Sequence, residues 1–169
     1  IILPKGWDVV RDCMHLKRIA IEDGDDTDLL FFVCDVADAF YKIPLADEEQ
    51  RFFTLCHDGK YYVWLRLGQG SLNGPTLFGR LSALLGRITQ STLDPNRARC
   101  QFYVDDPLTA MRAKRPYADM IVARTVLLWM ALGLDLATHK AQLGPSVGWI
   151  GYNVTDAPLD TTLAIKSEF

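Results

Sequence analysis

The sequence predicts an α+β fold, in which a mainly antiparallel sheet carries helices packed on one face. Residues 100–104 alternate apolar and polar side chains, as a strand with one buried face does, and residues 108–111 can form a returning strand. Residues 29–34 are apolar at every position, which is typical of a strand at the centre of a sheet. Two helical patterns begin near Pro75 and Pro116. Strands and helices are therefore both expected.

The length and composition are those of one ordinary globular domain. The chain has 169 residues, of which 49% are hydrophobic and 23% are charged, so it can bury a core of its own. We therefore expect a single domain over residues 1–169. No apolar run is long enough to cross a membrane and no secretory leader is recognisable. We expect an intracellular protein, cytoplasmic or nuclear, without a membrane partner, and the sequence indicates no oligomeric state.

The segment before the central strand is expected to be a helix followed by a loop. Within residues 7–20, Trp7, Val10 and Met14 recur at helical spacing, which predicts a helix with these side chains on its buried stripe. The acidic run at 22–28 lacks the glycine and glutamate positions of a calcium-binding loop. We interpret that run as a solvated loop.

A hairpin and two helices make up the middle of the chain. Residues 51–56 and 61–66 are rich in β-forming side chains and flank an Asp58-Gly59 turn signal. The first helix begins near Pro75 and carries one apolar stripe, formed by Leu77, Phe78, Leu81, Leu84, Leu85 and Ile88. The second begins near Pro116 and ends at Gly133, a plausible C-terminal cap. A last hairpin is expected over residues 147–154, and residues 156–169 contain no recognisable motif.

Cysteine and histidine positions argue against a zinc site. The four cysteines lack paired spacing and two of them lie in apolar strands, so we expect reduced core thiols at Cys13, Cys34, Cys56 and Cys100. The three histidines share no spacing either, at His15, His57 and His139.

Three aspartates follow predicted strands. Asp35 closes the apolar strand at 29–34, while Asp105 and Asp106 are expected in the tight turn of the second hairpin. Aspartate is a common turn former, so the pair alone could be structural. Bringing Asp35 beside them would raise carboxylate pKa values through burial and repulsion. A divalent cation such as Mg²⁺ would offset that cost, and two such ions can catalyse phosphoryl transfer.

The charge distribution bears on possible nucleic-acid binding. A net charge of −3 argues mildly against it, because phosphate contacts usually need a basic face. Acids are concentrated at 22–28 and at the three aspartates, however, and the middle of the chain is basic, with Arg80, Arg87, Arg97, Arg99, Arg112, Lys114 and Arg115.

Five motifs in this order resemble those of the palm of a reverse transcriptase. Residues 35–40, Asp-Val-Ala-Asp-Ala-Phe, resemble the family's first catalytic motif, and residues 103–106, Tyr-Val-Asp-Asp, resemble its second carboxylate motif. Between them, residues 67–75 resemble the template and nucleotide motif, although Ser71 to Gly74 departs from its commonest spellings. Lys140 matches the lysine of a fourth motif, and residues 149–152 resemble the primer grip. Each motif alone is weak evidence, but the ordered set is specific.

The resemblance implies a site that transfers nucleotides with two Mg²⁺ ions, for which Mn²⁺ could substitute. The implied metal ligands are Asp35, the Val36 carbonyl, Asp105 and Asp106, and Lys140 would act as a general acid. The implied nucleotide-binding residues are Ala37, Asp38, Ala39, Phe40, Gln69 and Gly70, and the implied primer grip is Trp149, Ile150, Gly151 and Tyr152. The ring of Phe40 would lie under the sugar and exclude a ribose 2′-hydroxyl.

The expected function is DNA synthesis from deoxynucleoside triphosphates on an RNA or DNA template with a primer. The short spacing between motifs resembles retroviral and long-terminal-repeat retroelement enzymes. Most of the fingers and the thumb that the family carries are missing from residues 1–169. That absence motivates an alternative, a non-catalytic, domesticated palm that binds nucleic acid or protein, and a two-metal nuclease is a weaker third interpretation.

Overall fold

An antiparallel four-stranded sheet forms the centre of the computed structural model, which describes residues 3–156 and 161–165. In spatial order the strands are β4 (Ala98–Tyr103), β5 (Asp106–Arg112), β1 (Leu29–Val33) and β6 (Gln142–Gly144). Each neighbouring pair is antiparallel. The α+β class predicted from the sequence is confirmed, with β1, apolar at every position, inside the sheet.

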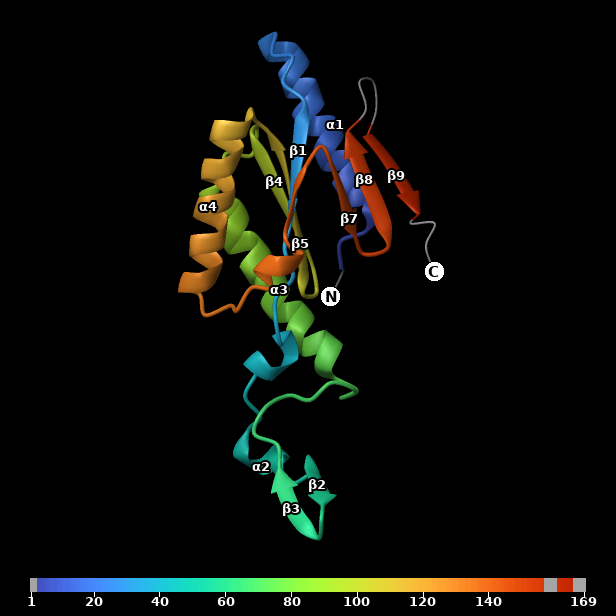
Figure 1. Cartoon of the computed structure of the whole chain (residues 1–169), viewed down its shortest axis with the longest axis vertical. Coiled ribbons are helices and arrows are strands. Elements are labelled where there is room, and N and C mark those ends of the chain that lie inside the picture. The colour runs from blue at the N-terminus through green and yellow to red at the C-terminus, as the bar shows by residue number, and fades with distance from the viewer. Residues whose placement is uncertain (1–2, 157–160, 166–169) are drawn as a thin grey trace.

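Two helices cover one face of this sheet. They are α3 (Gly74–Thr92) and α4 (Arg115–Ala131), which lie together beside the sheet in Figure 1. The fully buried ring of Trp129 stacks on Phe32 at 6.2 Å between centroids and meets Phe102 edge-on at 5.3 Å. Its indole N–H donates to the Thr89 hydroxyl at 2.8 Å, so the buried polar group is satisfied.

The opposite face is covered by α1 (Gly6–Asp23) and by a second antiparallel sheet. That sheet contains β7 (Ser146–Trp149), β8 (Tyr152–Asp156) and β9 (Thr161–Ile165), and Figure 1 shows it beside α1. Phe31 and Leu108 of the central sheet pack here against Val9, Leu16 and Trp149. Because both faces of the central sheet are buried, its central strands carry apolar side chains on both sides.

The buried stripe of α1 differs from the one predicted. Trp7 and Met14 are 74% and 58% exposed, and the stripe instead comprises Val9, Val10, Cys13, Leu16 and Ala20. Both sets recur at helical spacing. The observed stripe is longer, and the one charged residue buried beside it, Asp12, accepts a hydrogen bond from the Gln101 side chain of β4, so this face packs well against the sheet.

The acidic run after α1 is tied to the central sheet. Gly24 ends the helix in the left-handed conformation, at φ 65°. Asp23 pairs at 2.7 Å with Arg112, whose side chain is only 1% exposed, and Asp25 lies 3.4 Å from Arg97. The interpretation as a solvated loop is therefore incomplete, because two of these acids neutralise arginines contributed by β5 and by the turn before β4.

A hairpin extends away from these layers, as Figure 1 shows. Its strands are β2 (Thr54–His57) and β3 (Lys60–Val63), and the short helix α2 (Asp47–Gln50) precedes them. Both strands are exposed along their whole length. Asp58 and Gly59 form its turn with φ 50° and 70°, which confirms the predicted hairpin although its strands are shorter. Among the described helices, none is long and apolar enough to span a membrane.

Candidate active site

The sheet brings Asp35 next to the β4–β5 turn. Strand β1 runs antiparallel to β5, so that Val33 is opposite Leu108 and the end of β1 meets the start of β5. Just beyond β1, the backbone N–H of Val36 donates to the carbonyl of Asp105 at 3.0 Å. Two acids that are distant in the sequence are thus neighbours at one end of the sheet.

The turn that carries the acids is displaced by one residue from the prediction. Asp105 and Asp106 were expected to form it, but Val104 and Asp105 form it and Asp106 already pairs with Tyr103 as the first residue of β5. Val104 has φ 53°, a left-handed conformation that is unusual for a β-branched residue. Such backbone strain is concentrated at functional sites, where surrounding contacts hold it.

Lys140 neutralises part of the acidic cluster. It ends η2 (Thr138–Lys140), and its ammonium pairs with the carboxylate of Asp35. The hydrogen bond to Asp35 raises the pKa of Lys140, and the charges of Asp35, Asp106 and Asp105 raise it further. Burial raises the pKa of Asp105, an effect that the charge of Asp35 increases and that of Lys140 opposes. All three carboxylates therefore act on one ammonium.

The segment after Asp35 is held on the side opposite the turn. The Ala37 N–H donates to the Asp135 carbonyl at 2.8 Å, and the Ala137 N–H donates to the Asp35 carbonyl at 2.9 Å. In addition, the ammonium of Lys42 pairs with the carboxylate of Asp135. No local sequence signal indicated Lys42 or Asp135, because the two lie 93 residues apart in the chain.

The donor set suits a hard cation, although it is not a preassembled cage. Among the residues that the structure describes, no group of three or more acidic, cysteine or histidine side chains is arranged to hold a metal ion. Asp35 and Asp105 nevertheless supply carboxylate oxygens, and the raised pKa of Asp105 is the cost that a bound cation would offset. Asp106 lies toward a cavity that Tyr103 and Ile150 also line.

The predicted nucleotide segment combines strained and buried positions. Asp38 is left-handed at φ 51°, and it leads into η1 (Ala39–Lys42), where Ala39 is only 4% exposed. Ala39 therefore has little surface for a direct contact with a nucleotide. The ring of Phe40 packs on Phe78 of α3 at 5.6 Å. Gln69 and Gly70 are both exposed and lie in the loop before α3.

The predicted primer grip is the β7–β8 turn. Ile150 and Gly151 form it with φ 40° and 84°, and Tyr152 begins β8 with 36% of its surface exposed. Trp149 is only 2% exposed, which leaves it no surface for a direct primer contact. Its indole N–H donates to the Asp106 carbonyl at 2.9 Å, so it joins this turn to the acid-bearing hairpin.

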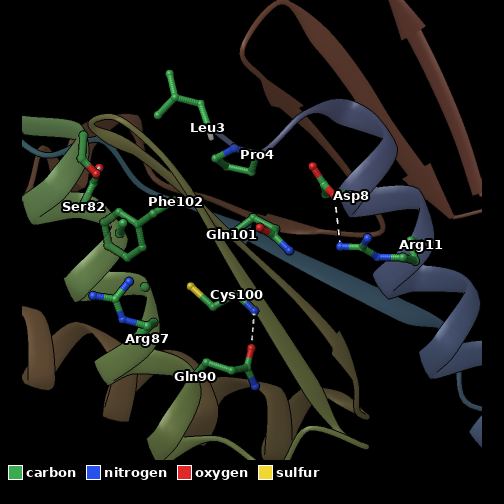
Figure 2. Close-up of a pocket in the computed structure, with 13 residues that line it drawn as sticks. Leu3, Pro4, Asp8, Arg11, Ser82, Arg87, Gln90, Cys100, Gln101 and Phe102 are labelled. Atoms are coloured by element: carbon green, nitrogen blue, oxygen red, sulfur yellow. Dashed lines mark hydrogen bonds and ion pairs between the residues drawn. The ribbon is translucent and has the colours of Figure 1, made fainter. Parts of the chain in front are cut away.

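A separate cavity of about 350 Å³ lies along β4, between α1 and α3 (Figure 2). Its polar walls are largely satisfied from within the chain. Asp8 pairs with Arg11 at 3.0 Å, and the Gln90 side chain accepts from the Cys100 N–H at 2.9 Å. The cavity is lined by none of the predicted site residues.

An antiparallel sheet with two helices on one face, a third helix and a small sheet on the other, and an acid-bearing hairpin beside a second strand-end acid is the architecture of a polymerase palm. The chain belongs to the reverse transcriptase (RNA-dependent DNA polymerase) family, whose sequence profile matches residues 10–154. The resemblance stated from the five motifs is thereby confirmed.

Curated relatives are retroviral polyproteins. The chain is 35% identical over 132 residues to the Gag-Pol polyprotein of avian reticuloendotheliosis virus, covering 73% of this chain and 11% of that protein. It is 32% identical over 82 residues to the Gag-Pol polyprotein of walleye dermal sarcoma virus, covering 48% of this chain and 4% of the relative. The chain thus spans about a tenth or less of these relatives.

Solved structures share the fold at low sequence identity. A foamy viral protease-reverse transcriptase in complex with an RNA/DNA hybrid has a TM-score of 0.65 at 22% identity, covering 84% of this chain and 18% of that one. Apo telomerase from Candida tropicalis, truncated from its C-terminal domain, has a TM-score of 0.66 at 9% identity, covering 95% and 40%. These similarities support the palm architecture.

Proposed function

We propose that this domain synthesises DNA from deoxynucleoside triphosphates as an RNA-directed DNA polymerase. One observation carries the proposal, the hydrogen bond from Val36 to Asp105 that sets the acids of two separate motifs side by side. Family membership supports it. The foamy viral relative was solved with an RNA/DNA hybrid, which supports a primed RNA or DNA template as partner.

In this proposal the acids hold the catalytic cations. Asp35, the Val36 carbonyl, Asp105 and Asp106 would bind two Mg²⁺ or Mn²⁺ ions. When bound, such ions supply activation of the primer 3′-hydroxyl and neutralisation of the charge that develops in phosphoryl transfer. The ammonium of Lys140, which pairs with Asp35 at this site, would give its proton to the departing pyrophosphate.

The neighbouring elements would position the substrates. Residues 37–40 with Gln69 and Gly70 would bind the incoming nucleotide, and Phe40 would lie under its sugar. Residues 149–152 would support the primer end, with Tyr152 exposed, Ile150 half-buried and Trp149 behind them. A non-catalytic binding role is not favoured by the comparisons, in which the chain is similar to Gag-Pol polyproteins and to a foamy viral protease-reverse transcriptase.

Primer extension on an RNA template tests the proposal, using the protein that carries this chain. We expect Mg²⁺-dependent extension that Asp105→Asn reduces by about 100-fold or more, because metal-ion stabilisation of a transition state is worth several kcal/mol. Asp119→Asn is the matched control, since Asp119 is an exposed acid on α4 that pairs only weakly with Arg115, at 3.6 Å. Equal activity of the two variants, or metal binding without extension, would contradict the proposal.

A further inference from the structure

Gly74, the first residue of α3, lies directly against the ring of Phe40. A Cβ atom at position 74 would come within 3.3 Å of Phe40 Cε1 and 3.4 Å of Cδ1, closer than carbon atoms ordinarily pack. Gly74 is not among the residues with positive φ, so its backbone would accept alanine. The glycine therefore provides space for the ring.

Phe78, on the same face of α3, limits where the ring of Phe40 can move. It follows Gly74 by one helical turn, so the two residues share a face of α3. Phe78 is completely buried and packs on Phe40 at 5.6 Å, with 39° between the ring planes. Phe40 also packs against the core beneath α3. Because that side is filled, a ring displaced from position 74 has to move outward from the helix.

We propose that Gly74 is a positioning residue that sets nucleotide sugar selection through Phe40. The inference rests on the proposed function, in which the ring of Phe40 lies beneath the sugar of the incoming nucleotide. The outward side of the ring is then the side that the sugar occupies. A methyl group at position 74 would press the ring toward the sugar, which weakens deoxynucleotide binding and strengthens exclusion of the 2′-hydroxyl.

The test compares Gly74→Ala with Gly86→Ala. Both glycines lie in α3, but a Cβ at Gly86 would meet Phe102 at an ordinary 3.6 Å, so this variant controls for helix propensity. Steady-state extension gives kcat and KM for each deoxynucleotide and ribonucleotide. We expect Gly74→Ala to raise the deoxynucleotide KM about threefold to fivefold with little change in kcat. This effect is well below the roughly 100-fold loss of rate that a misplacement of ~1 Å can cause, because the added methyl group displaces the ring only slightly.

The ratio of deoxynucleotide to ribonucleotide kcat/KM is the decisive measurement, because a general loss of stability would not change it selectively. We expect this ratio to rise in Gly74→Ala, to stay unchanged in Gly86→Ala and to fall in Phe40→Val. If Gly74→Ala behaves as Gly86→Ala does while Phe40→Val relaxes selection, the inference is overturned and the proposed function stands. Failure of the unsubstituted protein to extend any primer would instead overturn the proposed function.

Discussion

Among single residues, Lys140 shows how the cluster of carboxylates is kept stable without a cation. Asp105 is partly desolvated beside Asp35, and the ammonium of Lys140 supplies the opposite charge through its ion pair with Asp35. A divalent cation at these carboxylates would compete with that ammonium for the oxygens of Asp35. Lys140 would then be released toward the substrate, where the proposed proton transfer needs it.

We therefore expect Lys140→Met to bind Mn²⁺ more tightly than the unsubstituted protein, by roughly threefold to tenfold. Lys42→Met is the matched control, because Lys42 also forms an ion pair near the site but with Asp135. The two variants change the net charge equally, and only the first frees Asp35. Free Mn²⁺ measured by electron paramagnetic resonance during titration checks this without any catalysis. Equal affinities in the two variants would show that Lys140 does not compete with the cation.

Among the elements, the acid-bearing hairpin and the primer-grip hairpin form one unit. Each turn forces a β-branched residue into the left-handed region, with φ 53° at Val104 and 40° at Ile150. Such conformations cost roughly 1–2 kcal/mol per residue and persist only where neighbours hold them. Trp149 of the primer-grip hairpin contacts both strands of the acid-bearing hairpin, through its hydrogen bond to the Asp106 carbonyl and an edge-on contact with Tyr103 at 6.3 Å.

Trp149→Phe should loosen this unit. The substitution keeps an aromatic ring but removes the part-buried hydrogen bond to the Asp106 carbonyl, and such a bond contributes about 0.5–1.5 kcal/mol. We expect the free energy of unfolding in denaturant to fall by that amount. Trp7→Phe serves as the control, since Trp7 is 74% exposed and its replacement should change stability little. Equal stability of the two variants would mean that the bond does not hold the hairpins together.

Sequence periodicity predicted these elements better than it predicted their contacts. Alternation identified β4 because a half-buried strand imposes it locally, whereas β-forming runs on either side of an Asp-Gly turn signal identified the β2–β3 hairpin. The turn is one residue earlier than predicted. Aspartates favour turns, which suggested Asp105 and Asp106, but the pairing of Tyr103 with Asp106 places Asp106 in β5 and leaves Val104 and Asp105 in the turn. The predicted buried stripe of α1 held at Val10 but was wrong at Trp7 and Met14, because two stripes had helical spacing. Contacts such as Lys42 with Asp135 depend on residues 93 apart, which no local pattern encodes.

At the scale of the whole molecule, a layered palm carries a protruding hairpin. The central sheet lies between α3 and α4 on one face and α1 with the β7–β8–β9 sheet on the other (Figure 1). The order of the five motifs indicated the palm, and the second sheet was only partly foreseen because a predicted hairpin does not show which face it covers. The candidate site lies at the end of the central sheet, next to the segment that leads out to the hairpin.

The hairpin itself contributes no buried side chain from β2 or β3, so we expect the palm to fold without it. Replacing residues 56–61 by Asn-Gly would place a two-residue turn between Leu55 and Tyr62. These residues pair with each other as His57 and Lys60 do at the natural turn, and the two pairs are two residues apart along each strand, so the new turn meets the same kind of pair. The free energy of unfolding should change by less than ~1 kcal/mol.

Val147→Ala is the comparison for that shortened hairpin, because Val147 is 3% exposed in the core beneath α1 and its truncation should cost about 2 kcal/mol or more. Amide hydrogen exchange offers a second measurement, in which β2 and β3 should exchange at a lower opening free energy than β1 and β5. If shortening the hairpin destabilised the protein as much as Val147→Ala, the hairpin would be part of the cooperative core. If stability is unchanged while primer extension falls, the loss belongs to the protruding hairpin, since Asp35 and Asp105 remain in place.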